Sequence, residues 1–289
     1  MFSGSIPALV TPFTAGQVDE DAFRDLVEWQ IAEGSNALVP CGTTGEAATL
    51  DPDEHKRLIR IAVEVANGRV PVIAGCGSNN TAHAIELTRA AMEAGAAAAL
   101  HVPPYYNRPN QEGIDAHLRA IAELGFPIVL YNVPGRTVTD IAVGTIARLA
   151  ELPNVVGIKD ATGNLDRVTA QRLACGEGFC QLSGNDETAL AFNAMGGVGC
   201  ISVTANVLPR LCAEFQRATL HRDWDRALAL QDQLYPLHKA LFSDASPGPV
   251  KYALGRVRPG FPQELRLPMT PASEESCRLV DEALDKAGF

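Results

Sequence analysis

Short apolar runs alternate with longer amphipathic segments along most of the chain. Eight apolar runs are typical of buried strands, and they cover residues 5–13, 36–41, 71–76, 97–104, 127–134, 155–160, 179–186 and 197–205. The segments between them have the apolar spacing of helices, for example over 51–68, 81–95 and 111–125. Each of these three ends on a glycine, as many helices do. The pattern therefore predicts alternating strands and helices.

This alternation predicts an α/β fold with a parallel sheet. Eight strand–helix units of similar length, without a break in composition, fit a (β/α)8 barrel (a TIM barrel). A doubly wound sheet is the alternative, but it usually shows G-x-G-x-x-G after the first strand, where this chain has TPFTAGQ. After Leu208 no further strand is predicted, and we expect helix throughout. We predict a catalytic barrel over residues 1–223 and a C-terminal helical extension over residues 224–289.

In a barrel, the chemistry lies at the C-terminal ends of the strands. The segments at these ends are rich in Gly, Thr, Asn and Tyr. They are CGTTGE (41–46), GCGSNN (75–80), PPYYNRP (103–109), YNVPGRT (131–137), KDATGN (159–164), SGND (183–186) and SVTAN (202–206). Hydroxyls, amides and free backbone N–H groups suit carboxylate and carbonyl ligands. This end of the barrel is the predicted site.

Lys159 stands at the end of the strand VVGIKD (155–160). Strict alternation puts Val155, Gly157 and Lys159 on the inner face of the barrel, and Val156, Ile158 and Asp160 on the outer face. The other four lysines, Lys56, Lys239, Lys251 and Lys286, lie in helical or tail segments and need only surface roles. A buried structural ion pair is one interpretation of Lys159, although arginine suits that purpose better. Burial favours the free amine, which can add to a ketone and form an imine, so placement favours Schiff-base catalysis.

Other residues at this end are candidate partners for the lysine. Tyr131, on the adjacent strand, is either a proton shuttle or a buried tyrosine with a satisfied hydroxyl. Thr43 and Thr44 either relay a proton and bind a carboxylate or only form a tight turn. Arg136 either holds an acidic substrate group in a bidentate manner or lies on the surface.

Composition excludes several classes of function. The formal net charge is −10, which argues against a nucleic-acid partner. No apolar run has the length of a membrane span, and the N-terminus lacks the pattern of a secretory signal. The seven cysteines are odd in number and lack C-x-x-C spacing, as expected of free thiols in a reducing compartment. No histidine pair has metal-site spacing, so we expect no metal. Because neither a membrane span nor a secretory signal is predicted, we expect a cytoplasmic location.

Taken together, these motifs resemble the dihydrodipicolinate synthase family of pyruvate-dependent aldolases, whose superfamily also holds N-acetylneuraminate lyase. The similarity runs from GSIPALVTPF (4–13) to LRLPMTP (265–271) and includes GTTGEAATL (42–50), PYYNRP (104–109), YNVPGRT (131–137), GIKDATGN (157–164) and ISVTANV (201–207). The combination is specific to that superfamily.

The resemblance implies a role for each matching residue. Lys159 would form the Schiff base with pyruvate, and Tyr131 would shuttle protons. Thr43 would relay protons to Tyr106, a second tyrosine that the family donates across a dimer interface. Thr44 would hold the pyruvate carboxylate, and Arg136 the carboxylate of L-aspartate 4-semialdehyde.

Further implications concern the pocket and assembly. Gly184 and Ile201 match backbone positions that line the pyruvate pocket. The resemblance implies no metal or organic cofactor, and a homotetramer built as a dimer of dimers. An aldolase or dehydratase acting on a keto-deoxy sugar acid or N-acetylneuraminate is the alternative. The lyase branch reads G-S-T-G-E and lacks the arginine, so GTTGE and Arg136 favour the synthase. A non-catalytic barrel is disfavoured because the whole set of site residues is present.

Some members of the family are inhibited by lysine at the dimer interface. The matching positions here are Ala48, His55, Asn79, His83 and Tyr105. His83 departs from the regulated pattern, which has a glutamate there for the ammonium of the ligand. An imidazole holds a cation poorly, so we expect weak or absent lysine inhibition.

Overall fold

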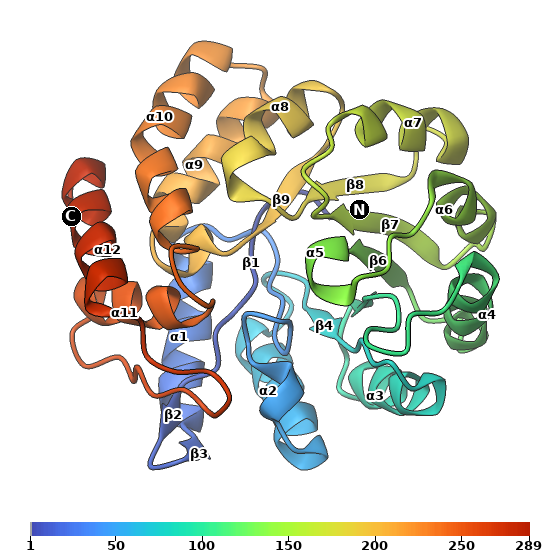
Figure 1. The fold of residues 1–289 in the computed structure, drawn as a ribbon, viewed down its shortest axis with the longest axis horizontal. Helices are drawn as coiled ribbons and strands as arrows, with labels where there is room; N and C mark the ends of the chain where they lie inside the picture. The colour runs from blue at the N-terminus through green and yellow to red at the C-terminus, as the bar shows by residue number, and fades with distance from the viewer. Residues whose placement is uncertain (1) are drawn as a thin grey trace.

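The computed structural model describes residues 2–289 and contains a seven-stranded parallel sheet curled around a central axis (Figure 1). In spatial order the strands are β1 (Gly4–Pro7), β9 (Gly199–Ser202), β8 (Cys180–Ser183), β7 (Val155–Asp160), β6 (Ile128–Asn132), β5 (Ala98–His101) and β4 (Ile73–Gly75). Seven of the eight predicted strands are therefore confirmed as regular strands; β7 has the predicted bounds, and the other six are shorter than their apolar runs.

The eighth predicted strand, residues 36–41, closes the barrel. Val39 forms a parallel bridge to Ala8, and Leu38 forms one to Val72. The ladder is short here because Pro40 has no N–H, although its carbonyl still accepts a hydrogen bond from Gly75 N. The sheet thus joins β1 to β4 through this segment, and the predicted (β/α)8 barrel is confirmed.

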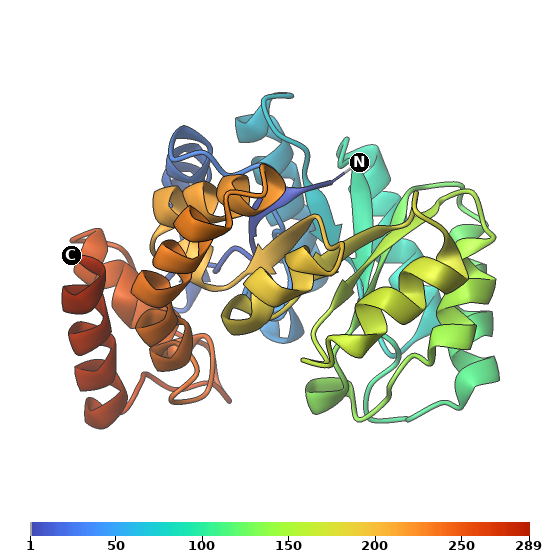
Figure 2. The ribbon, with the colours of Figure 1, turned by 90° about the horizontal axis from the view of Figure 1, so that it is seen from above.

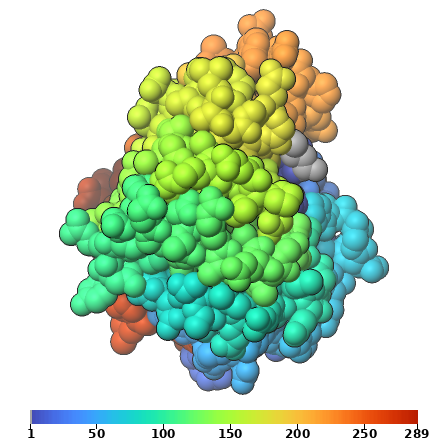
Figure 3. Space-filling model, turned by 90° about the vertical axis from the view of Figure 1, so that its right-hand side faces the viewer, coloured from blue at the N-terminus to red at the C-terminus, as the bar shows by residue number. Residues whose placement is uncertain are grey.

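Helices pack around the outside of the sheet, and the chain between residues 81 and 175 covers much of the face shown in Figure 3. The outer ring comprises α1 (Glu20–Ala32), α2 (Pro52–Ala66), α3 (Thr81–Glu93), α4 (Gln111–Ala122), α6 (Val143–Ala150), α7 (Asp166–Cys175), α8 (Ala189–Ala194) and α9 (Pro209–Leu220). Helix α2 begins where the predicted helical segment 51–68 begins, because the Asp51 side chain accepts from Asp53 N and Glu54 N, and Pro52 occupies the first helical position. It ends at Asn67, which adopts a left-handed conformation, one residue before the predicted Gly68.

Shorter elements complete the strand-to-helix connections. A small hairpin, β2 (Phe13–Thr14) and β3 (Gln17–Val18), follows β1. Helix α5 (Pro134–Thr137) follows β6, and the 3-10 turns are η1 (Ala47–Thr49), η2 (Asp186–Thr188) and η3 (Thr204–Asn206).

Three more helices, α10 (Trp224–Ala240), α11 (Gly248–Val257) and α12 (Glu274–Ala287), lie at the opposite end of the molecule from α3 to α6 (Figure 2). The expectation of helix throughout residues 208–289 is wrong for residues 258–273, which cross the surface without regular structure. Four prolines, at 259, 262, 268 and 271, interrupt helical hydrogen bonding there. The proposed division between residues 223 and 224 stays a prediction. Within residues 2–289, no helix is both long and apolar enough to cross a membrane.

Candidate active site

Lys159 and Tyr131 lie side by side at the C-terminal ends of β7 and β6. They are paired in the ladder, and Lys159 Nζ is 4.2 Å from the centroid of the Tyr131 ring. Tyr131 belongs to the apolar cluster inside the barrel, which also contains Val129, Leu182 and Ile201. The prediction that Lys159 points inward near Tyr131 is therefore confirmed.

The predicted alternation is wrong at the start of β7. The register between β6 and β7 shifts there, so that Ile128 pairs with Val155 but Val129 pairs with Gly157. This irregularity reverses the first two residues: Val155 packs in the outer cluster with the helices, and Val156 packs against the inner cluster. Alternation holds from Gly157 onward, which is why the orientation of Lys159 is unaffected.

Lys159 is only 5% exposed, yet no carboxylate within residues 2–289 lies within 4.0 Å of its Nζ. Gly184 packs directly on its side chain: a Cβ at Gly184 would come within 3.1 Å of Lys159 Cε and 2.5 Å of Ala161 Cβ. Ile201 is fully buried in the inner cluster beside Tyr131. Lys159 is therefore buried against the Tyr131 ring and Gly184, with no carboxylate partner within residues 2–289 that would occupy its amine.

A cavity of about 450 Å³ adjoins Tyr131, although Lys159 itself is not one of the residues that line it. Thr43, Tyr131 and Arg136 line the cavity. Thr44, next to Thr43 in the chain, is buried and is not one of the lining residues. Arg136 is exposed on α5, and within the described chain it has no carboxylate partner. Its guanidinium is thus available to an anionic ligand entering the cavity.

The loop that carries the two threonines is held by a buried ion pair that the sequence analysis missed. Lys251 Nζ, on α11, donates to Glu46 Oε1 at 2.6 Å and to the Glu264 carbonyl at 2.7 Å. Burial lowers the pKa of Lys251, and the adjacent Glu46 carboxylate partly offsets this. The surface role expected for Lys251 is therefore wrong. The sequence around Lys251 does not predict this ion pair, because its partner Glu46 lies 205 residues away.

Glu46 is also held from the irregular segment after α11. Its Oε2 accepts from Arg266 N at 3.1 Å, and the Arg266 side chain pairs with Glu54 at the start of α2. Glu46 itself has a left-handed backbone, with φ of 55°. The C-terminal region thus fixes the turn that presents Thr43 and Thr44.

Tyr106 is 91% exposed and has a left-handed backbone, with φ of 72°. Within residues 2–289 no hydrogen bond joins it to Thr43 or Tyr131, so one chain alone does not assemble the predicted relay. An exposed tyrosine in this rare conformation is costly unless another structure covers it.

The residues matched to the regulatory site gather at the outer part of the same cavity. Ala48, His55, His83 and Tyr105 line it, and Asn79 Nδ2 donates to the Tyr105 carbonyl. Burial lowers the pKa of His55 to about 4, so this imidazole is neutral near pH 7. His83 is half-exposed, with its Nδ1 3.7 Å from Glu86.

A second cavity, of about 510 Å³, lies at the other mouth of the barrel and is lined by residues such as Phe2, Val155 and Phe179. Its lining is apolar, apart from the thiols of Cys175 and Cys180, whose pKa values burial raises. Within the described residues, no three His, Cys, Asp or Glu side chains are placed to hold a metal ion. The candidate catalytic residues therefore lie at the other end of the barrel, where Lys159 is.

Comparison with known proteins agrees with this geometry. The model of the dihydrodipicolinate synthetase family matches residues 1–287. Proteins named 4-hydroxy-tetrahydrodipicolinate synthase from Rhizorhabdus wittichii and Sphingopyxis alaskensis are 64% and 62% identical, each alignment covering 99% or more of both chains.

Solved structures give the same result. Dihydrodipicolinate synthase from Aquifex aeolicus is 43% identical, with a TM-score of 0.95 over 99% of this chain and 98% of that one. The chloride-inhibited dihydrodipicolinate synthase from Acinetobacter baumannii, complexed with pyruvate, is 46% identical, with a TM-score of 0.95 over 100% and 99% of the two chains. The chain therefore belongs to the dihydrodipicolinate synthetase family.

Proposed function

We propose that this enzyme condenses pyruvate with L-aspartate 4-semialdehyde to form 4-hydroxy-tetrahydrodipicolinate, in the biosynthesis of diaminopimelate and lysine. The observation that carries the proposal is the enclosed amine of Lys159, which lies against the Tyr131 ring and has no carboxylate partner within residues 2–289. Full-length relatives with the synthase name support the choice of reaction.

The proposed reaction begins at Lys159 Nζ, which attacks the ketone carbon of pyruvate. Tyr131 donates a proton to the departing oxygen, and water leaves as the imine forms. Loss of a methyl proton gives the enamine, whose carbon then attacks the aldehyde of the second substrate. The amine of that substrate finally attacks the imine carbon, which closes the ring and releases Lys159.

The other candidate residues take supporting roles in this proposal. Thr44 binds the pyruvate carboxylate, while Gly184 and Ile201 line the pyruvate pocket. Thr43 relays protons, and Arg136 binds the carboxylate of the semialdehyde. The exposed guanidinium of Arg136 at the cavity wall supports the last assignment.

Tyr106 completes the relay from a second copy of the chain, and the assembly is a homotetramer built as a dimer of dimers. Its 91% exposure and left-handed backbone support a partner-facing role. Sedimentation of the purified protein tests the assembly: a monomer with full activity would exclude the shared site.

The reaction is tested with purified protein, pyruvate and aspartate semialdehyde, with formation of the cyclic product as the readout. The matched control replaces the semialdehyde with keto-deoxy sugar acids and N-acetylneuraminate. We expect product only in the first assay. Cleavage of a sugar acid, without synthase turnover, would reassign the enzyme within its superfamily.

We propose that lysine inhibits the enzyme weakly or not at all, because His83 lacks the carboxylate that would pair with the ammonium of the ligand. Adding lysine to the synthase assay tests this, with H83E as the comparison. We expect lysine to inhibit H83E more strongly than the parent. Potent inhibition of the parent would contradict the proposal.

We also propose a cytoplasmic enzyme, without a nucleic-acid or membrane partner, whose barrel (1–223) carries the chemistry and whose extension (224–289) supports it. The seven unpaired cysteines favour a reducing compartment.

A further inference from the structure

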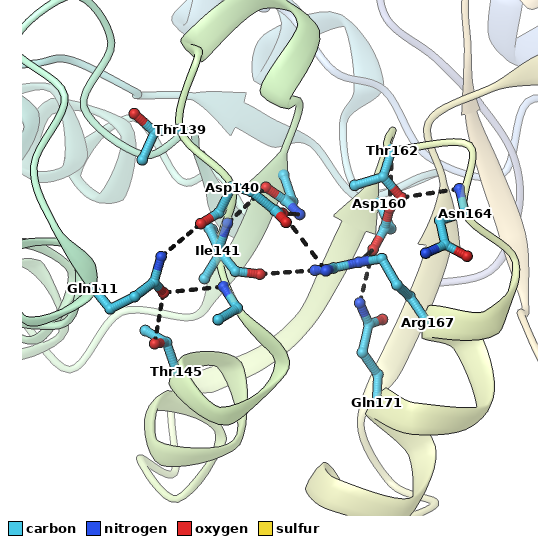
Figure 4. Close-up of polar contacts among 12 residues, drawn as sticks. Gln111, Thr139, Asp140, Ile141, Thr145, Asp160, Thr162, Asn164, Arg167 and Gln171 are labelled. Atoms are coloured by element: carbon cyan, nitrogen blue, oxygen red, sulfur yellow. Dashed lines mark hydrogen bonds and ion pairs between the residues drawn. The ribbon is translucent and has the colours of Figure 1, made fainter.

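A polar cluster on the outer side of β6 and β7 remains outside the proposed mechanism. We call it the strand-end network; it consists of Asn132, Asp140, Asp160, Arg167 and Gln171. Figure 4 shows Arg167 reaching from α7 toward both Asp160 and the segment that contains Asp140 and Ile141. The network joins three parts of the chain at the edge of the barrel that carries the candidate site.

Asp160 is the first centre of this network. It is 4% exposed, and its carboxylate accepts four hydrogen bonds. Thr162 donates its N–H and hydroxyl to Oδ1, while Arg167 Nε at 2.9 Å and Gln171 Nε2 at 2.7 Å donate to Oδ2. A buried carboxylate needs such donors, and they in turn fix the end of β7 against α7.

Arg167 links this carboxylate to the segment after β6. Its side chain is 11% exposed, and it donates from Nη2 to the Ile141 carbonyl at 2.8 Å. Its Nη1 lies 3.6 Å from Asp140 Oδ1. One planar guanidinium therefore binds two otherwise separate segments in a fixed relation.

Asn132 is the second centre, at the end of β6. Its Nδ2 donates to Asp140 Oδ1 at 2.7 Å, and its Oδ1 accepts from Ile141 N at 3.1 Å. These bonds close the loop of residues 133–140, in which Arg136 lies. The position of Arg136 thus depends on Asn132 and Asp140.

The network lies directly behind the reactive pair. Asn132 pairs with Asp160 in the ladder, one residue after the Tyr131–Lys159 pair. Because successive side chains of a strand point to opposite faces, outward groups that fix the backbone also fix the inward lysine and tyrosine. We infer that Arg167 is a positioning residue, which sets Lys159 against Tyr131 and holds the Arg136 loop. This inference rests on the proposed function.

The test compares R167M with R172M. Arg172 lies on the same helix but contacts the Met195 carbonyl, outside the network. Two readouts are measured well below the unfolding temperature: the rate of borohydride-trappable imine formation with pyruvate alone, and KM and kcat for aspartate semialdehyde. For R167M relative to R172M, we expect imine formation to slow by about 10-fold and KM to rise by about 10-fold, since small misplacements have effects of this order or larger.

D140A provides a second variant, because Asp140 is half-exposed and its loss leaves the Asp160–Arg167 pair in place. It should raise KM for the semialdehyde several-fold with pyruvate trapping nearly unchanged. D140A tests the part of the inference that concerns the Arg136 loop; if R167M does not fold, R167K, which keeps the charge but not the planar contacts of Arg167, replaces it in both assays. Lower thermal stability with unchanged trapping and KM would overturn the inference. Failure of the unmodified enzyme to trap pyruvate would instead refute the proposed function, and this inference with it.

Discussion

Two buried lysines in this protein have opposite surroundings. Lys159 and Lys251 both lie over an aromatic ring, at 4.2 Å from Tyr131 and 4.4 Å from Phe13 respectively. Lys251 is fully buried and bonded to Glu46, whereas Lys159, at 5% exposure, has no carboxylate within 4.0 Å in residues 2–289. The ring is common to both sites, so the carboxylate is the distinguishing feature.

The difference separates a structural lysine from a reactive one. Lys251 Nζ forms a buried ion pair with Glu46 at 2.6 Å, which joins α11 to the turn that carries the two threonines. Lys159 has no such partner within residues 2–289, and a cavity gives a ketone access to its neighbour Tyr131. The same substitution at the two positions should therefore have different consequences.

The largest expected effect comes from K159M, which removes the amine while keeping most of the side-chain volume. Synthase activity should fall by at least about 10³-fold, because the covalent intermediate no longer forms. The free energy of unfolding, measured with urea, should change by no more than about 1 kcal/mol, because no ion pair is broken. A large loss of stability would make Lys159 structural.

K251M should produce the reverse pattern. Within residues 2–289 it leaves the Arg266 N–H as the one hydrogen-bond donor to the buried Glu46 carboxylate, which should cost about 3–5 kcal/mol of unfolding free energy. The reactive amine remains, so folded K251M should still form the pyruvate imine. Unchanged stability would contradict the role assigned to the pair.

The stability of the fold should also depend on pH through His55, a buried residue in the wall of the candidate-site cavity. The folded-state pKa of His55 is about 4, below the usual 6.5, so the unfolded chain binds more protons between these values. Its contribution to stability is complete above pH 6.5 and is lost as the pH falls toward 4. Between pH 7.5 and 5, His55 should account for a loss of about 2 kcal/mol. H55N should weaken the pH dependence by that amount in urea unfolding, and an identical dependence would refute the assignment.

A recovery of similar size is expected in the double variant E46Q/K251M. Glutamine can still accept from Arg266 N, and no buried charge is left unpaired. The double variant should be about 1–3 kcal/mol more stable than K251M, as a double-mutant cycle with E46Q would show. A fully additive cycle would mean that the two side chains do not interact.

The sequence predicted Lys159 better than Lys251 for a physical reason. The orientation of Lys159 follows from strand alternation, a local property, and it survives the register shift at Val155 because that shift precedes Gly157. Burial of Lys251 depends on Glu46 and on the irregular segment around Arg266, which meet only in the folded chain. Local pattern also does not show that residues 36–41 would contribute only two bridges to close the barrel.

The most direct test of the central claim is borohydride reduction in the presence of pyruvate, followed by peptide mapping. We expect a single reduced adduct on the peptide that contains Lys159, in the unmodified enzyme and in K251M, and none in K159M. An adduct on another lysine, or one that persists in K159M, would contradict it.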